Sequence, residues 1–189
     1  MLKDLITQNR SYRRFHQEKI VIRETLLELV ELARLSASGG NQQPLKFVLS
    51  CEPSKNELIF PQLSWARLLE GWSGPQDGER PAAYIIILHD KRVSPNYFCD
   101  QGIAAQSILL GATEKGLGGC MVGAIRRDEL RRVLAISEYY DIILVIALGY
   151  PAEKVVIETV GGDGSTKYWR DSAGVHHVPK RALKDIIVS

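Results

Sequence analysis

Residues 100–123, with the sequence DQGIAAQSILLGATEKGLGGCMVG, constrain the fold more than any other part of the chain. Apolar side chains recur through 103–112 at helical spacing, and small residues occupy much of the remaining surface. Because such a helix is apolar or small nearly all round, other elements must enclose it on several sides. The small residues allow other backbones to approach closely, at a cost of about 1 kcal/mol for each interior glycine relative to alanine.

Glycines end this helix and shape the segment that follows it. Gly116 suits the left-handed conformation that caps a helix, and 118–123 reads as extended chain with little side-chain bulk. A flat ligand could lie against such a backbone, and a plain glycine-rich turn is the alternative. The run 116–121 is not a dinucleotide fingerprint, because its third glycine would fall at Met121 and it follows a helix instead of a strand. A Rossmann fold is therefore not expected.

Hydrophobic periodicity places the other elements along the chain. It predicts helices over 3–8, 21–37, 64–70 and 127–135, and strands over 45–51, 82–88 and 142–148. Residues 155–159 and 166–170 flank a Gly-Gly-Asp-Gly sequence and predict a β-hairpin. Residues 52–80 are irregular and rich in proline and glycine, so we interpret them as a lid or cover segment.

Length and composition favour a single globular domain, 1–189, in the cytoplasm. A chain of 189 residues buries about 70% of its unfolded surface. The formal net charge of +2 gives no reason to expect nucleic acid or a membrane surface as a partner. We find no apolar run of about 18 residues and no apolar core of a signal peptide. The three cysteines lack metal-ligand spacing, which is typical of a reducing compartment.

Two polar segments are candidates for ligand binding. In 9–15, NRSYRRF, the side chains of Arg10, Ser11 and Arg13 could direct several donors at one phosphate, although a solvated basic loop would look the same. In 36–44, SASGGNQQP, small and amide residues supply donors and acceptors that suit the edge of a heteroaromatic ring. A simple connection between a helix and a strand is the alternative for this second segment.

Neither the histidines nor the cysteines predict a metal site or a catalytic group. The adjacent side chains of His176 and His177 diverge, and no cysteine or carboxylate pattern accompanies them. Cys120 has no neighbouring basic residue in the sequence to lower its pKa, and a buried unpaired thiol is usually inert.

Taken together, these segments resemble the nitroreductase family of FMN-dependent oxidoreductases. Six motifs stand in the family's order: RSYRRF at 10–15, SGGNQQPLKF at 38–47, DQGIAAQSILLGA at 100–112, GLGGCMVG at 116–123, ALGYP at 147–151 and KRALKDII at 180–187. The chain departs at Leu45, where the family loop has tryptophan, and at Asn9, where the family often has another arginine. The number of arginines on the phosphate is therefore open.

The resemblance implies an α+β, nitroreductase-like fold with a central mixed β-sheet flanked by helices. It also implies an intertwined homodimer with its sites at the interface, in which Ala105 and Ile108 of the central helix would face the symmetry mate. The residues that would bind FMN fall into three groups. The phosphate would be held by Arg10, Ser11, Arg13, Lys180 and Arg181; the other subunit would supply Ser38, Gly39 and Asn41; main-chain groups along the isoalloxazine ring would come from Met121, Val122 and Gly123.

The implied activity is transfer of hydride from NADH or NADPH to FMN and then to a small electron-poor acceptor such as a nitroaromatic or a quinone. The kinetics would be ping-pong, because the donor must leave the flavin before the acceptor enters. No catalytic residue is expected, since the hydride chemistry belongs to the flavin. One alternative is a flavin-binding sensor or store without significant turnover, and another is an α+β interaction domain that binds no flavin.

Overall fold

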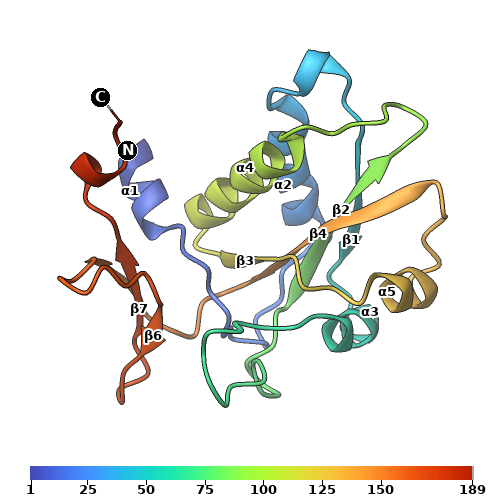
Figure 1. Ribbon diagram of the computed structural model, residues 1–189. Coiled ribbons are helices and arrows are strands. Elements are labelled where there is room, and N and C mark those ends of the chain that lie inside the picture. The colour runs from blue at the N-terminus through green and yellow to red at the C-terminus, as the bar shows by residue number, and fades with distance from the viewer. Residues whose placement is uncertain (189) are drawn as a thin grey trace.

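The computed structural model describes residues 1–188 and shows a main sheet with helices on both faces beside a smaller C-terminal sheet (Figure 1). The main sheet has the order β1-β2-β4-β3, with all neighbours antiparallel. Its strands are β1 (Leu45–Ser50), β2 (Ala83–Asp90), β4 (Tyr140–Gly149) and β3 (Gly118–Val122). The mixed pairing that was expected of the central sheet occurs in the smaller sheet, which contains one parallel and one antiparallel pair, whereas the main sheet is antiparallel throughout. This arrangement confirms the expected α+β fold class.

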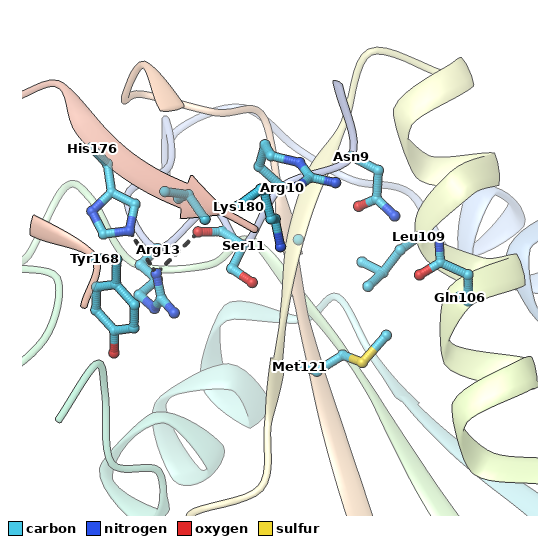
Figure 2. Close-up of a pocket in the computed structure, with 12 residues that line it drawn as sticks. Asn9, Arg10, Ser11, Arg13, Gln106, Leu109, Met121, Tyr168, His176 and Lys180 are labelled. Atoms are coloured by element: carbon cyan, nitrogen blue, oxygen red, sulfur yellow. Dashed lines mark hydrogen bonds between the residues drawn. The ribbon is translucent and has the colours of Figure 1, made fainter. Parts of the chain in front are cut away.

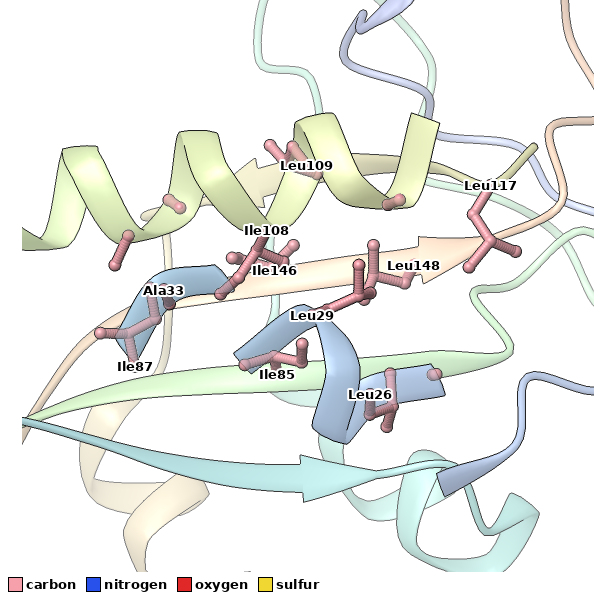
Figure 3. Packing of buried hydrophobic residues seen from close by; sticks show 14 of the residues in the cluster. Leu26, Leu29, Ala33, Ile85, Ile87, Ile108, Leu109, Leu117, Ile146 and Leu148 are labelled. Carbon is pink, nitrogen blue, oxygen red and sulfur yellow. The ribbon is translucent and has the colours of Figure 1, made fainter. Parts of the chain in front are cut away.

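Two hydrophobic clusters lie on opposite faces of the main sheet. Helices α2 (Arg23–Leu35) and α4 (Asp100–Glu114) close the first cluster, which Figure 3 shows, and α3 (Pro53–Ile59) and α5 (Arg127–Val133) lie beside the second. Successive residues of a strand point to opposite faces, so Ile85 and Ile87 enter the first cluster, whereas Tyr84 and Ile86 enter the second. Burial on both faces explains the continuous apolar run of β2.

Helix α4 is enclosed mainly by its own chain. A Cβ atom on Gly111 would lie 2.3 Å from Leu32 Cδ1, so glycine at this position lets α2 approach closely. Ala105 and Ile108 are both 0% exposed in the first cluster. The expectation that these two residues contact a symmetry mate is therefore wrong, because α2 and the sheet of the same chain already cover them.

The segment before β2 differs from the sequence prediction. Residues 64–70 form turns instead of a helix, and the helix lies earlier at α3, followed by a 3₁₀ turn at Phe60–Gln62. Ala66 and Gly71 have positive φ angles of 33° and 72°, which do not occur within a right-handed helix. Trp65, 7% exposed, packs 5.8 Å from the Phe60 ring, so tertiary packing overrides the local helical pattern. The function of 52–80 as a lid stays a prediction.

The expected hairpin around 161–164 does not form. In the small sheet, β7 (His176–Lys180) lies between β5 (Val155–Thr159), to which it is parallel, and β6 (Trp169–Arg170), to which it is antiparallel. The Gly-Gly-Asp-Gly sequence does form a turn, in which Gly164 has a φ of 69°. However, the two flanking segments do not pair with each other, because both pair with β7, which lies further along the chain. Helix α1 (Leu2–Gln8) and the 3₁₀ turns Gly39–Asn41 and Leu183–Asp185 complete the structure.

Among the helices of residues 1–188, none has the length and apolar character required to cross a membrane.

The two adjacent histidines of β7 have opposite electrostatic environments. His177 Nδ1 lies 2.5 Å from Glu158 Oε1, and its Nε2 lies 3.2 Å from Asp171 Oδ2. The hydrogen bond with Glu158, followed by the one with Asp171, raises the pKa of His177. The side chain of His176 is 1% exposed, and burial, with the positive charge of Arg13 as the next cause, lowers the pKa of His176 to about 4.

This pair predicts a stability maximum near the ordinary histidine pKa of 6.5. Above it, the proton on folded His177 is lost as the pH rises through its raised pKa, so the contribution of His177 declines. Below it, the unfolded chain protonates His176 before the folded chain does, so the free energy of unfolding falls as the pH drops from about 6.5 toward about 4. Urea unfolding of the wild type, His176→Leu and His177→Gln across about pH 4–9 tests this.

We expect His176→Leu to flatten the acid side of the profile and His177→Gln to flatten the alkaline side. The same change of slope in both variants would contradict the assignment.

Candidate functional site

A cavity of about 330 Å³ lies between the loop after α1, helix α4, strand β3 and the small sheet (Figure 2). We call it the basic cavity. Its volume falls at the lower end of the range of about 300–1,000 Å³ that is usual for small-molecule sites. The residues that line it are Asn9, Arg10, Ser11, Arg13, Gln106, Leu109, Gly119, Met121, Tyr168, His176, Val178 and Lys180.

Glycines allow the N-terminal loop to lie directly on strand β3. Tyr12 N donates to Gly119 O at 3.0 Å, and Ser11 and Gly119 form a parallel bridge. A Cβ atom on Gly118 would lie 2.5 Å from the Tyr12 ring, and one on Gly119 would lie 2.5 Å from Leu109 Cδ2. Removal of side-chain bulk from β3 therefore brings the arginine loop and α4 to the same strand.

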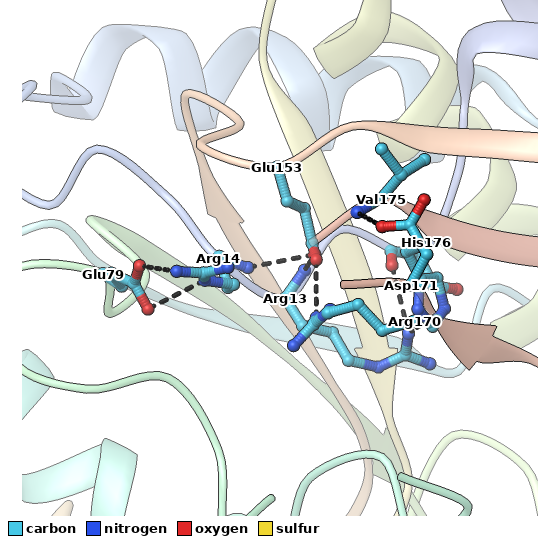
Figure 4. Close-up of polar contacts among 9 residues, drawn as sticks. Arg13, Arg14, Glu79, Glu153, Arg170, Asp171, Val175 and His176 are labelled. Atoms are coloured by element: carbon cyan, nitrogen blue, oxygen red, sulfur yellow. Dashed lines mark hydrogen bonds and ion pairs between the residues drawn. The ribbon is translucent and has the colours of Figure 1, made fainter. Parts of the chain in front are cut away.

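A buried carboxylate fixes the backbone of this loop. The side chain of Glu153 is 1% exposed and accepts hydrogen bonds from the main-chain nitrogens of Arg13 at 2.5 Å and Arg14 at 3.2 Å (Figure 4). Its other oxygen accepts from Arg170 Nη2 at 2.7 Å. Glu153 is bonded to the main-chain nitrogen of Arg13 and not to its side chain, so the guanidinium group of Arg13 remains available to a ligand in the cavity.

Arg13 is oriented by three groups of the cavity wall. Its Nη1 donates to Ser11 O at 3.2 Å and lies 3.4 Å from His176 Nε2, while its Cζ lies 5.1 Å from the Tyr168 ring centroid. The lowered pKa of His176 keeps its imidazole neutral, so Nε2 can accept from Arg13. Arg10 Nη2 donates to Ile6 O at 2.7 Å, and the buried Arg10 Nε has no hydrogen-bond partner within residues 1–188.

The donor set fits a phosphorylated ligand with an apolar body. The lining residues include three cations, Arg10, Arg13 and Lys180, beside the Ser11 hydroxyl, and no carboxylate. Guanidinium groups bind phosphate oxygens in pairs, and a phosphate monoester carries about −1.5 to −2 charges at neutral pH. Leu109 and Met121 supply apolar surface in the same cavity. An FMN phosphate group beside a flat ring is compatible with this arrangement.

The structure brings together five of the residues that the sequence indicated: Arg10, Ser11, Arg13, Met121 and Lys180. Arg181 and Gly123 are exposed and do not line the cavity, and Val122 is buried in the second cluster. Ser38, Gly39 and Asn41 lie after α2 and do not line it either. Ser38 Oγ and Gly39 N both donate to the buried Asp100 carboxylate, at 2.6 and 2.9 Å.

Sequence reasoning missed part of the cavity wall: Gln106, Leu109, Tyr168, His176 and Val178. The alternation of β7 could have indicated one side of it, because His176, Val178 and Lys180 share a face. Tyr168 has no comparable signal, since its position depends on the pairing of β6 with β7.

Cys120 is not part of the lining. It is 4% exposed in the second cluster, and its Sγ donates weakly to Met121 O at 3.6 Å. Burial raises the pKa of the Cys120 thiol, with the charge of Arg13 acting in the opposite direction. A protonated, enclosed thiol is a poor nucleophile.

Comparison with known proteins agrees with this architecture. A protein of Archaeoglobus fulgidus, provisionally named NADH dehydrogenase/NAD(P)H nitroreductase, is 25% identical over 149 residues, which cover 75% of this chain and 80% of the relative. A nitroreductase family protein of Clostridium novyi NT has a similar fold, with a TM-score of 0.67 and 20% identity over 100% of this chain and 99% of that one.

The structure of an FMN-dependent nitroreductase from Clostridium difficile is also similar, with a TM-score of 0.64 and 22% identity over 79% of this chain and 87% of that one. The model of the Nitroreductase family matches residues 6–150, which contain the arginine loop, α4, β3 and the whole main sheet. The chain therefore belongs to the nitroreductase family and is an oxidoreductase.

Proposed function

We propose that this oxidoreductase uses FMN to transfer hydride from NADH or NADPH to a small electron-poor acceptor, such as a nitroaromatic or a quinone. The observation that carries the proposal is the group of three cations and the Ser11 hydroxyl in one cavity beside the glycine-rich strand β3. The name of the similar Clostridium difficile protein, an FMN-dependent nitroreductase, supports the choice of cofactor. When bound, FMN supplies the hydride-accepting and hydride-donating chemistry.

The residues of this chain bind and orient the cofactor. Arg10, Ser11, Arg13 and Lys180 would hold the phosphate, and Arg181, next in sequence, would add charge at the edge of the site. The main-chain groups of Met121, Val122 and Gly123 would lie along the ring. Glu153 would keep the arginine loop in place before the ligand arrives, so less ordering is required on binding.

We further propose that a second copy of the chain completes the site. Ser38, Gly39 and Asn41 do not line the basic cavity of their own chain, yet the Ser38 hydroxyl and the Gly39 amide are positioned by Asp100. In a homodimer these residues would reach the flavin of the partner. The outer side of α2 offers apolar surface for such an interface, since Leu27 is 49% exposed and Leu35 is 66% exposed. Leu27 also lines a groove of about 780 Å³ between α2 and β1.

We expect purified protein to bind FMN and to be bleached by NADH or NADPH under anaerobic conditions, with the colour restored by a quinone. Stopped-flow absorbance measures both half-reactions, and ping-pong steady-state kinetics should accompany them. FMN binding without bleaching would instead indicate a flavin sensor or store. A lack of FMN binding would reject the proposal.

Cys120→Ser provides the matched control for this experiment. Because the thiol is buried and absent from the cavity lining, both half-reactions should stay within about tenfold of the wild type, or ~1.4 kcal/mol in activation free energy. A loss of about a thousandfold at full FMN occupancy would place chemistry on Cys120.

Replacement of Arg10 or Arg13 by alanine should weaken FMN binding by about one to two decades. Each change removes a charge-assisted hydrogen bond worth about 1.5–3 kcal/mol. Equilibrium titration of the apo-protein with FMN measures the effect. Arg132→Ala, at a site 72% exposed on α5, is the control and should leave the affinity unchanged. Unchanged affinity in the Arg10→Ala, Arg13→Ala double variant would remove the basic cavity from the cofactor site.

A charge on the outer side of α2 should separate the subunits and lower FMN occupancy. The Leu27→Asp, Leu35→Asp double variant tests this by sedimentation velocity and by the ratio of flavin to protein absorbance. Leu58→Asp on α3, which is 46% exposed, serves as the control and should remain dimeric. A wild-type monomer saturated with FMN would refute the proposed dimer.

A further inference from the structure

A second cavity, of about 200 Å³, lies between the chain around Gln17, helix α3 and the beginning of β2. We call it the rear cavity. Tyr84, which lines it, belongs to the second hydrophobic cluster, whereas Leu109 of the basic cavity belongs to the first. The two cavities share no lining residue, so the rear cavity is separate from the proposed flavin site.

Buried donors without acceptors gather around the rear cavity. Tyr84 is 0% exposed, and its hydroxyl has no hydrogen-bond partner in the described part of the chain. The buried Nε of Arg80, which also lines the cavity, has no partner there either. The same holds for the indole nitrogen of Trp65, whose ring lies 5.8 Å from Phe60. The Arg80 guanidinium lies 4.6 Å from the centroid of the same Phe60 ring, which lines the cavity, so the side chains of Arg80 and Trp65 both pack against Phe60.

The amide oxygens that line the rear cavity are already used, because Asn56 Oδ1 accepts from Ser50 Oγ at 2.7 Å. Burial raises the pKa of Tyr84, so its hydroxyl stays protonated and can donate. The Gln17 side-chain oxygen already accepts from Gly78 N at 2.9 Å and Arg80 N at 3.0 Å. Gln17 therefore has only its N–H groups to offer a ligand. Each unsatisfied buried donor lowers the stability of the folded chain, and a ligand that brings oxygen acceptors would recover part of that loss.

The charge in the rear cavity favours an anion at its Arg80 end. The carboxylate closest to Arg80 is Asp77, which is 83% exposed and 3.7 Å away, so this pair is weak. Glu57 also lines the cavity, but it belongs to the exposed side of α3. A negatively charged group would therefore bind beside Arg80, the only cation among the described residues that line the rear cavity.

The remaining wall limits the size and polarity of the ligand. Ile20, Phe60 and Pro81 provide apolar surface. A cavity of about 150 Å³ is known to hold benzene, so about 200 Å³ can hold one six-membered ring with a small substituent. The ligand would thus have a single ring or a branched apolar body and one carboxylate.

We propose that the rear cavity is a second binding site, for a small carboxylate whose oxygens accept from Tyr84 and Arg80 and whose apolar body packs against Phe60. This site is independent of the proposed flavin chemistry. Binding requires side-chain adjustment of Arg80 and Tyr84, because the Tyr84 hydroxyl and Arg80 Nε are enclosed in this structure.

Isothermal titration calorimetry of the FMN-saturated protein with sodium benzoate tests the proposal. We expect one benzoate per chain and at least tenfold weaker binding in both Tyr84→Phe and Arg80→Met. Benzamide, which has the same ring without the charge, should bind the wild type at least tenfold more weakly. The basic cavity is examined with Arg13→Ala at saturating FMN, which should bind benzoate as the wild type does.

Several outcomes would overturn the assignment. They are absence of benzoate binding, equal affinity for benzamide, unchanged affinity in Tyr84→Phe, or loss of benzoate binding in Arg13→Ala. Tyr84→Phe removes only one oxygen, which is buried and unpaired within residues 1–188, so its FMN content should match the wild type and its urea midpoint should be no lower. These two measurements separate lost binding from lost folding. The comparison of benzoate with benzamide needs no variant and decides the outcome even where a variant fails to fold.

Discussion

The basic cavity depends on one buried carboxylate. Glu153 connects the arginine loop, through two main-chain hydrogen bonds, to the small sheet, through Arg170 (Figure 4). A buried carboxylate is costly unless it is paired and hydrogen-bonded, and here a cation and two N–H groups meet that need. Arg170 in turn lies 5.0 Å from the Trp72 ring, and Arg14 pairs with Glu79. The segment before β2 is therefore attached to the same network as the ligand-binding loop.

The small sheet shows how neighbouring residues can carry opposite protonation states. His176 faces the cations of the cavity and stays neutral, which allows it to accept from Arg13. His177 faces Glu158 and Asp171, and its hydrogen bonds with these carboxylates raise its pKa and favour the protonated form. Its ring also stacks on Trp169, with 4.0 Å between the ring centroids. A protonated His176 would add a fourth positive charge beside Arg13 and remove an acceptor. Because burial keeps His176 neutral, His176 can accept from Arg13, and the cavity needs no additional carboxylate to balance a fourth positive charge.

The sequence predicts correctly those helices and strands whose burial is evident from their own hydrophobic pattern. It fails where contacts between residues far apart in the chain determine the structure. The all-round apolar pattern of α4 and the continuous apolar run of β2 both anticipate their burial. The arginine loop and Lys180 could be assigned to one site by family resemblance, and the structure brings them together. The hairpin prediction failed because β7 competes for both flanking segments, and the helix predicted at 64–70 failed because Trp65 packs against Phe60. Tyr168 and His176 join the cavity only through that same pairing of β7.

Four of the buried polar groups without partners in residues 1–188 belong to residues that line the two cavities where we propose ligands. Arg10 Nε and His176 Nδ1 belong to residues that line the basic cavity, and Tyr84 and Arg80 line the rear cavity. A folded chain normally pairs its buried polar groups, because each unpaired group costs free energy that packing must offset. Elsewhere in the described chain, buried polar side chains such as Asp100, His89 and Ser50 have partners within hydrogen-bond distance. Trp65 Nε1 and Arg170 Nε, however, are also unpartnered in the described chain and line neither the basic nor the rear cavity. An unpaired buried donor therefore supports a ligand site only where a cavity lies beside it.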